Sequence, residues 1–285
     1  MPILSARARL AGVIGWPVSH SRSPLLHNRW LERYGIDGAY VPLPVRPGML
    51  AAAVQGLRAA GFAGVNVTLP HKPEAATLCD ELTPSARLTG AVNTLVFGET
   101  IVGHNTDGAG FVAHLRASGV DPAAGPALLL GAGGAARAIA AALLAEGVPV
   151  TVSNRNPERA AALAAALPGL RTLPWEQRGA MPGSALPDSA LRDSALLVNT
   201  TSLGMAGQPP LPMRLDRARP GLVVADIVYV PLETPLLATA RARGLRTVDG
   251  LGMLLHQAGA GFAAWFGQAP EVDADVRDLL VASLA

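Results

Sequence analysis

One lysine stands out in this chain because nearly all of its other basic side chains are arginines. Of the 23 Lys and Arg residues only Lys72 is a lysine, and it lies in the segment Gly64-Val-Asn-Val-Thr-Leu-Pro-His-Lys-Pro. An ammonium can lose its proton when burial or neighbours lower its pKa, whereas a guanidinium stays protonated. With Asn66 and Thr68 nearby, Lys72 is a candidate proton-transfer group. The alternative is a surface charge left by chance composition.

Further polar segments follow the strands predicted in the first half of the chain. They are Ser19-His-Ser-Arg-Ser23, Asn66-Val-Thr68, Asn93-Thr94 and Asn105-Thr-Asp107. Ligands of parallel sheets collect beyond the carboxyl ends of the strands, so these segments can converge there. Hydroxyls, amides, one carboxylate and one ammonium suit a small, polyhydroxylated, anionic molecule. Each segment also has a structural alternative: the serines and Asp107 can cap helices, and the asparagines can tie down turns.

A glycine-rich turn opens the second half. Gly131-Ala-Gly-Gly-Ala-Ala-Arg137 follows the apolar strand predicted over 127–130 and precedes an alanine-rich helix predicted over 135–146. This is the context of a dinucleotide-binding fingerprint, in which the pyrophosphate lies at the helix N-terminus. An ordinary strand-to-helix turn is the alternative.

The end of the next predicted strand indicates which dinucleotide binds. An NAD site usually has an acidic residue there, which binds the ribose 2′-hydroxyl. This chain has Asn154 and Arg155, with Arg159 one helical turn later. Two guanidinium groups without a strand-end carboxylate favour a 2′-phosphate and therefore NADP, although arginines at a helix start are often merely solvated.

The elements that must position these residues alternate between strands and helices, which predicts an α/β fold with parallel strands. The order also predicts three segments: an α/β domain over 1–107, a Rossmann-like doubly wound domain over 108–248, and helices over 249–285 that return to the first domain. The predicted strands are 10–14, 39–43, 63–68, 91–97, 100–103, 127–130, 150–153, 195–199, 222–227 and 246–248. The predicted helices are 24–34, 48–60, a short one after Lys72, 108–118, 135–146, 157–167, 234–243, 253–266 and 272–283, with loop and short helix over 174–193.

Composition excludes several classes of protein. The net charge of +2 argues against a nucleic-acid surface or a polybasic membrane anchor. The single cysteine, Cys79, excludes an internal disulfide and a cysteine-cluster metal site, and no His spacing suggests a metal. The chain start lacks a long apolar run typical of a signal peptide. We expect a cytoplasmic protein that acts on a small molecule, as a monomer or a homodimer.

Taken together, the motifs resemble those of the shikimate dehydrogenase family. They occur in the same order as in the family and cover residues from about 12 to 262. The matching motifs are Ser-Arg-Ser-Pro, Asn-Val-Thr-Leu-Pro-His-Lys, Gly-Ala-Val-Asn-Thr, Asn-Thr-Asp-Gly, Gly-Ala-Gly-Gly-Ala-Ala-Arg, Ser-Asn-Arg, Asn-Thr-Thr-Ser-Leu-Gly-Met, Asp-Ile-Val-Tyr and Asp-Gly-Leu-Gly-Met-Leu-Leu-His-Gln-Ala. The resemblance implies an oxidoreductase that interconverts shikimate and 3-dehydroshikimate with NADP, a step toward aromatic amino acids.

The resemblance also assigns roles to individual residues. Lys72 and Asp107 would form the catalytic pair. The substrate would be bound by Ser21, Ser23, Asn66, Thr68, Lys72, Asn93, Asp107, Tyr229 and Gln257. The cofactor would be bound by Gly131, Ala132, Gly133, Gly134, Ala135, Arg137, Asn154, Arg155, Arg159, Thr200, Ser202, Met205, Ile227, Gly250 and Met253. Whether Lys72 alone or the pair takes the proton stays open at this point.

Two other functions remain as alternatives. A quinate/shikimate dehydrogenase could use NAD or both cofactors, and the serines at 21 and 23 favour shikimate over it. Asn156 in place of a frequent Thr slightly weakens the NADP prediction. A non-catalytic nucleotide-binding regulatory module would not need Lys72 and Asp107. A folate dehydrogenase with a catalytic lysine would share the two-domain plan, but its expected motifs lack Ser-x-Ser and Asn-Thr-Asp.

Overall fold

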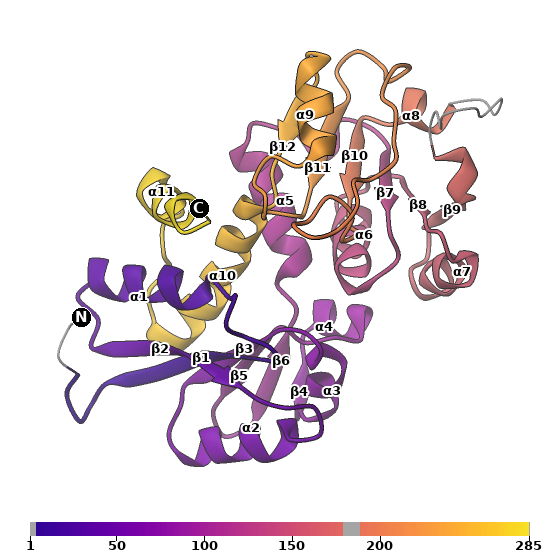
Figure 1. Cartoon of the computed structure of the whole chain (residues 1–285). Coiled ribbons are helices and arrows are strands. Elements are labelled where there is room, and N and C mark those ends of the chain that lie inside the picture. The colour runs from indigo at the N-terminus through magenta and orange to yellow at the C-terminus, as the bar shows by residue number, and fades with distance from the viewer. Residues whose placement is uncertain (1–3, 179–188, 285) are drawn as a thin grey trace. The chain divides into compact units, whose positions relative to one another are not determined.

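The computed structural model describes residues 4–178 and 189–284. They form two compact units, each built on a six-stranded sheet (Figure 1). The first unit runs to Asp107 and takes in Leu255–Ser283, and the second spans Gly108–Leu254. Within the described ranges, no helix is both long and apolar enough to span a membrane.

The sheet of the first unit has the strand order β2-β1-β3-β5-β6-β4. Its strands are β1 (Arg9–Gly15), β2 (Gly38–Pro44), β3 (Gly64–Val67), β4 (Glu81–Leu82), β5 (Thr94–Phe97) and β6 (Ile101–His104). The helices that begin in this part of the chain are α1 (Ser23–Arg33), α2 (Leu50–Ala59), α3 (Lys72–Thr77) and α4 (Pro84–Thr89). Strands β1, β2 and β3 are parallel, whereas β5 is antiparallel to both neighbours, so the predicted hairpin joins the sheet.

Alternation of side chains along these strands separates two faces. Ile14, Val65 and Leu95 belong to an apolar cluster with residues of α2, α3 and α4. Asn66 and Thr94, the strand neighbours of Val65 and Leu95, point to the opposite face. They form one polar row with His104 of β6, which pairs with Thr94. The sheet therefore carries a row of polar side chains on the face opposite the apolar cluster.

The C-terminal segment completes the first unit. Helix α10 (Leu251–Phe266) contributes Trp265, whose indole N–H donates to the Leu95 carbonyl at 3.0 Å. The indole lies against Gly64, where a Cβ atom would come within 2.2 Å of it. Helix α11 (Ala274–Ala282) is held to α1 by Arg29 and Arg33, which pair with acidic residues at its start. Residues of α10 and α11 thus pack against other parts of the first unit.

The second unit has an all-parallel sheet in the order β12-β11-β10-β7-β8-β9, the doubly wound order of a dinucleotide-binding fold. Its strands are β7 (Ala127–Leu130), β8 (Val150–Ser153), β9 (Arg171–Leu173), β10 (Leu196–Asn199), β11 (Val223–Asp226) and β12 (Arg246–Val248). Its helices are α5 (Asp107–Ala117), α6 (Gly134–Ala145), α7 (Pro157–Ala166), α8 (Ser189–Asp193) and α9 (Pro235–Ala242), with a 3-10 turn over Trp175–Gln177.

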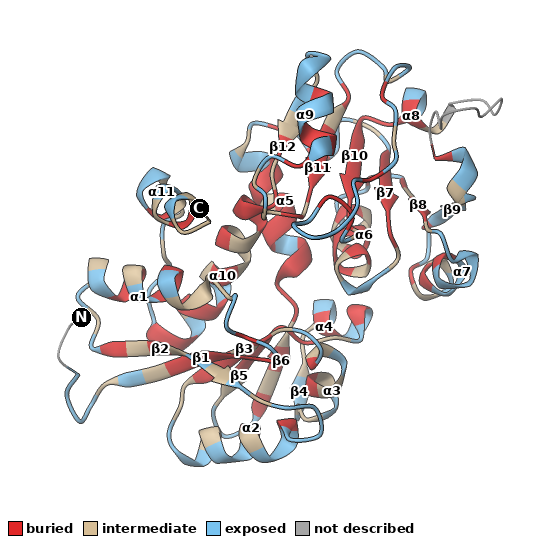
Figure 2. Ribbon diagram, viewed as in Figure 1, coloured by how far each residue is buried: buried red, intermediate tan, exposed pale blue. Residues whose placement is uncertain are grey.

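Helices cover both faces of this second sheet. Residues of α5, α6 and α7 pack on one face, and residues of α8 and α9 pack on the other. The central strands β7, β10 and β11 are buried almost throughout (Figure 2). A parallel strand buried on both sides reads as a continuous apolar run, which is why the sequence predicted these strands closely.

The predicted elements agree with the structure, with three omissions. Strand β4, helix α4 and strand β9 were not predicted. The two strands have two and three residues and the helix has six, so their sequences carry too little periodicity to be recognised. Part of the loop predicted over 174–193 lies outside the described residues.

Candidate functional site

Lys72 and Asp107 form an ion pair in the first unit. The Lys72 Nζ and the Asp107 Oδ2 are 2.6 Å apart, and the side chains are 25% and 5% exposed. Lys72 is the first residue of α3, and Asp107 is the first residue of α5. The preceding His71 is buried and its Nε2 lies 2.8 Å from the Val45 carbonyl oxygen, which anchors the start of α3. The pair is therefore held at a defined place, with the ammonium partly open to solvent.

Asn93 completes the environment of the aspartate. Its Nδ2 donates to the Asp107 Oδ1 at 2.8 Å and to the Thr106 hydroxyl at 2.9 Å. Its Oδ1 accepts from the Thr106 N–H and from the Thr94 hydroxyl, both at 3.0 Å. Asp107 thus accepts from Lys72 on one oxygen and from Asn93 on the other. A carboxylate held by two donors stays oriented, and this use goes beyond the helix cap considered from sequence.

Asn66 extends the network along the same row of the sheet. Its Nδ2 donates to the Thr94 hydroxyl at 3.0 Å and to the Asn93 carbonyl at 3.1 Å. Its Oδ1 accepts from the Tyr40 hydroxyl at 2.6 Å. Ser23 also hydrogen bonds to Tyr40. A continuous chain of hydrogen bonds therefore runs from Ser23 to Lys72, so the four polar segments predicted to converge do so.

Tyr40 is the link that the sequence analysis missed. It is buried on β2, and burial raises the pKa of its hydroxyl well above the usual value while the Ser23 hydrogen bond opposes this shift. Its ring stacks on the His27 imidazole, with centroids 4.0 Å apart and planes 2° from parallel. Complete burial lowers the pKa of His27 to about 3, so the imidazole is neutral. The sequence signal that could have identified Tyr40 was its place in the middle of a predicted strand, in a chain with only three tyrosines.

The other predicted substrate residues of this unit are less tightly connected. The Ser21 hydroxyl accepts from the Ser23 N–H at 3.3 Å and so also supports the start of α1. The Thr68 hydroxyl makes no hydrogen bond to any described residue. Its methyl group lies close to Gly15, and a Cβ atom on Gly15 would be 2.5 Å from it. The Gln257 Oε1 is buried and lacks a hydrogen-bond donor among the described residues. A buried acceptor without a donor is costly, so it fits a ligand hydroxyl.

In the second unit, the glycine turn joins β7 to α6. Gly131 has φ +111°, and a Cβ atom there would lie 2.6 Å from the Thr200 hydroxyl. Gly133 is the N-cap of α6 without a side-chain cap, and a Cβ atom on Gly133 or Gly134 would meet nothing within 4 Å. The helix start therefore faces open space bordered by backbone, and this cradle fits a pyrophosphate.

The candidate 2′-phosphate site lies at the next strand end. Asn154 donates from Nδ2 to the Asn156 carbonyl at 2.8 Å, and Asn156 caps α7 by accepting from the Arg159 N–H at 2.9 Å. Arg155 and Arg159 are exposed, and neither guanidinium has a partner among the described residues. Two exposed guanidinium groups at the start of a helix, without partners among the described residues, are suited to bind a phosphate.

The remaining predicted cofactor residues occupy three segments of the second unit. Thr200 donates its hydroxyl to the Leu130 carbonyl at 2.6 Å, beside the glycine turn. Gly250 lies against the Ile227 backbone, where a Cβ atom would approach within 2.4 Å. Met205 is 40% exposed, whereas Met253 is 8% exposed and belongs to the core. The lone tyrosine of this unit, Tyr229, is half-buried and follows the Ile227 segment.

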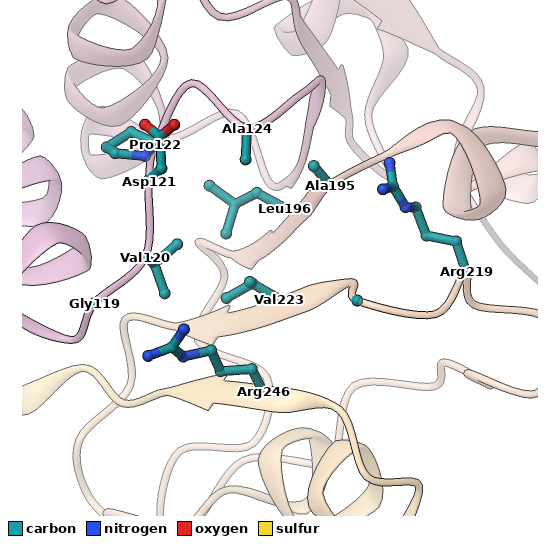
Figure 3. A pocket seen from close by; sticks show the side chains of 11 residues that line it. Gly119, Val120, Asp121, Pro122, Ala124, Ala195, Leu196, Arg219, Val223 and Arg246 are labelled. Carbon is teal, nitrogen blue, oxygen red and sulfur yellow. The ribbon is translucent and has the colours of Figure 1, made fainter.

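A separate pocket lies at the other end of the strands of this sheet, where they begin (Figure 3). It is lined by the loop before β7 and by the amino-terminal ends of β10, β11 and β12, with Arg219 and Arg246 at its sides. Arg246 is already committed, because it donates to the Ser118 carbonyl at 2.6 Å. Ligands of open α/β sheets bind beyond the carboxyl ends of the strands, so this amino-end pocket is not the cofactor site.

Comparison with known proteins identifies the family. Residues 13–95 match the family described as shikimate dehydrogenase substrate binding domain, and residues 116–177 match shikimate / quinate 5-dehydrogenase. A shikimate dehydrogenase (NADP(+)) of Acidiphilium cryptum is 64% identical over 272 residues, which cover 95% of each chain. The chain belongs to the shikimate dehydrogenase family.

Solved structures of related proteins share the whole fold. Shikimate 5-dehydrogenase of Thermus thermophilus, in complex with NADP(H) and shikimate, is 37% identical with a TM-score of 0.85, covering 97% of this chain and 100% of its own. A 5-ketofructose reductase of a Gluconobacter strain is 33% identical with a TM-score of 0.87, covering 99% and 100%. The predicted family and α/β fold are confirmed, whereas the roles of individual residues stay predictions. The second neighbour also means that the fold alone does not decide the substrate.

Proposed function

We propose that this chain catalyses the reversible, NADP-dependent oxidation of shikimate to 3-dehydroshikimate. The observation that carries the proposal is the Lys72–Asp107 pair, embedded in a hydrogen-bonded set of hydroxyls and amides. The set fits a small polyhydroxylated carboxylate, and relatives with the same motifs are named shikimate dehydrogenase (NADP(+)). These names support the predicted reaction, the predicted cofactor and the assignment to the oxidoreductases.

The chemistry needs a group that removes a proton from the substrate hydroxyl. NADP⁺ supplies the other half of the reaction by accepting the hydride from the carbinol carbon. The Lys72 Nζ takes the hydroxyl proton while one of its own protons passes to the Asp107 Oδ2, 2.6 Å away. The C–O bond then becomes a carbonyl, and reduction of 3-dehydroshikimate follows the same steps in reverse. Because the two groups share a hydrogen bond, we assign proton transfer to the pair as one coupled unit.

The other assignments follow from the family resemblance. Ser21 and Ser23 at the start of α1 would bind the substrate carboxylate, and the unpaired Gln257 Oε1 would accept from a ring hydroxyl. Gly131 to Arg137 would hold the pyrophosphate, and Asn154, Arg155 and Arg159 the 2′-phosphate. In this proposal the first unit binds substrate and the second binds NADP, and the reaction takes place in the cytoplasm.

An absorbance assay of NADPH formation tests the function. We expect rapid NADPH formation from shikimate and at least about tenfold slower turnover with quinate, whose extra hydroxyl lies near the carboxylate site. We also expect weak use of NAD, because a site built for a phosphate rejects an analogue that leaves it unpaired. The reverse assay compares 3-dehydroshikimate with 5-ketofructose, the substrate class named for one structural neighbour. Preferential reduction of 5-ketofructose, or NADP binding without turnover of any of these compounds, would reject the proposal.

A further inference from the structure

A buried carboxylate in the second unit has no role in the chemistry proposed above. Asp226 ends β11 and Asn199 ends β10, and the two are partners in the parallel ladder. Their side chains are 2% and 0% exposed. Buried polar side chains at the carboxyl ends of adjacent central strands lie where such sheets place their ligands. Neither side chain is open to solvent, so neither can itself contact a cofactor.

The carboxylate accepts three hydrogen bonds. The Asp226 Oδ1 accepts from the Asn199 Nδ2 and from the Val228 N–H, each at 3.0 Å. Its Oδ2 accepts from the Thr234 hydroxyl at 2.8 Å. These donors come from β10, from the segment that follows β11, and from the start of α9. An acceptor-only group at this point therefore joins three parts of the chain.

Asn199 carries the connection onward to the loop after β10. Its Nδ2 donates to the Leu203 carbonyl at 3.0 Å as well as to Asp226. Its Oδ1 accepts from the Thr201 N–H at 3.0 Å and from the Thr201 hydroxyl at 2.7 Å. All the hydrogen-bonding capacity of the amide is in use, so its orientation is determined. We name Asn199, Thr201 and Asp226 the Asp226 network.

The two loops held by this network are those that the family resemblance assigns to the nicotinamide half of the cofactor. One carries Thr200, Ser202 and Met205, and the other carries Ile227. The loops are also joined directly, because the Ala206 N–H donates to the Val230 carbonyl at 2.8 Å. A shift of the Asp226 carboxylate would therefore move both loops.

Stability alone does not account for a charge at this position. Burial raises the pKa of Asp226 to about 6, and only Asn199, Val228 and Thr234 oppose the shift. These are the groups that face the carboxylate from each adjoining element, and none of them titrates. Since the folded-state pKa exceeds the ordinary aspartate value, stability falls as the pH rises through the interval between about 4 and about 6. The ionised form is kept at some cost in stability, as expected for a group that secures one geometry.

We infer that Asp226 is a positioning residue that holds the loops after β10 and β11 in the arrangement that binds the nicotinamide half of NADP. The inference rests on the proposed function, because it takes NADP as the cofactor from it, and the family resemblance assigns the loops to the nicotinamide half. The adenosine half is bound elsewhere in that proposal, at the glycine turn and at Arg155 and Arg159. Loss of Asp226 should therefore weaken binding of one half of the cofactor only.

Calorimetric titration with two ligands tests this selectivity. The ligands are NADP⁺ and 2′-phospho-ADP-ribose, which retains the adenosine half and lacks nicotinamide. For Asp226→Ala we expect an affinity for NADP⁺ about tenfold lower and an affinity for 2′-phospho-ADP-ribose within about twofold of the parent protein, because loss of positioning affects the displaced half alone. Leu236→Ala, which truncates a buried core residue of α9, is the control for lost stability and should not change the ratio of affinities.

A conservative variant keeps the inference testable if Asp226→Ala does not fold. Asp226→Asn can still accept through Oδ1 and donate to the Thr234 hydroxyl, so NADP⁺ affinity should be restored to within about threefold of the parent.

The outcomes distinguish failure of the proposed function from failure of the inference about Asp226. If the parent protein binds neither ligand, the proposed function is wrong. If the parent binds both and Asp226→Ala weakens them equally or not at all, or Leu236→Ala causes the same selective loss, the inference about Asp226 is overturned.

Discussion

The two candidate sites of this protein are organised in opposite ways. In the first unit, Lys72, Asp107, Asn93 and Asn66 already hydrogen bond to one another. In the second unit, the glycine turn presents uncapped backbone, and the arginines at the next strand end have no partner among the described residues. One site is a side-chain network, and the other is a backbone cradle with free charges beside it.

This difference follows from what each ligand requires. Proton transfer depends on side chains held at fixed positions, and a hydrogen-bonded network supplies this before the substrate arrives. A pyrophosphate needs only N–H groups and a path close to the backbone, for which glycine suffices. We therefore expect changes in the network to lower turnover or weaken substrate binding, and changes in the cradle to lower cofactor affinity. Four predictions test this contrast.

The largest effect is expected for Lys72→Ala. Turnover should fall by a factor of about 10³ or more, because general acid–base catalysis alone contributes about 10² to 10⁴. NADP⁺ affinity, measured by calorimetry, should stay within about twofold of the parent. Lys72→Arg should also lose turnover even though it can still pair with Asp107, since a guanidinium does not exchange protons in this range. Near-normal turnover in either variant would remove Lys72 from the mechanism.

Gly133→Val should affect binding rather than chemistry. A Cβ atom at Gly133 meets nothing within 4 Å, and its φ of −90° suits any residue, so the melting temperature should change little. The side chain would occupy the cradle, and we expect NADP⁺ affinity to fall by about 10². Gly131→Ala is the matched contrast: its φ of +111° and its contact with Thr200 predict a loss of stability. Unchanged NADP⁺ binding by Gly133→Val would show that the turn is structural only.

The double change Arg155→Ala, Arg159→Ala should alter which dinucleotide is used. We expect kcat/KM for NADP⁺ to fall by about 10- to 100-fold while the value for NAD⁺ changes little, because only the 2′-phosphate loses its partners. Arg171→Ala, an exposed arginine on β9, is the control. An equal loss with both cofactors would mean that the arginines act on something other than the 2′-phosphate.

Tyr40→Phe should give the smallest effect. It removes the hydroxyl that donates to Asn66, at a cost of about 1 kcal/mol for one hydrogen bond. We expect KM for shikimate to rise by about three- to tenfold with little change in NADP⁺ affinity, as measured by steady-state kinetics and calorimetry. Tyr34→Phe is matched, since its hydroxyl accepts from the Glu271 N–H away from the network. If both variants behave alike, Tyr40 serves stability and not the orientation of Asn66.

Much of the fold could be predicted because its strongest signals are local. The buried parallel strands of the second unit are uninterrupted apolar runs, and Gly131 marks the turn between the first strand and its helix. The short elements could not be predicted, since six residues of α4 or two of β4 carry little periodicity. The antiparallel place of β5 between β3 and β6 also depends on contacts between distant segments.

The candidate site, too, could be predicted only in part. Sequence motifs placed Lys72, Asn66, Asn93 and Asp107 in one group, and the structure joins them by hydrogen bonds. The motifs did not include Tyr40, because its partner Asn66 lies 26 residues away in sequence and its role appears only when β2 and β3 flank β1.

The sequence by itself determined the family, the order of the elements and the types of group available for chemistry, because these depend on residue identity and short spacings. Only the tertiary structure decided which donor meets which acceptor. It joined Tyr40 to Asn66, left the Gln257 Oε1 without a donor among the described residues, and enclosed Asp226 beside Asn199. Hydrogen bonds act over about 3 Å, a distance that sequence separation does not specify. The folded chain therefore sets whether a residue reacts, binds or positions its neighbours.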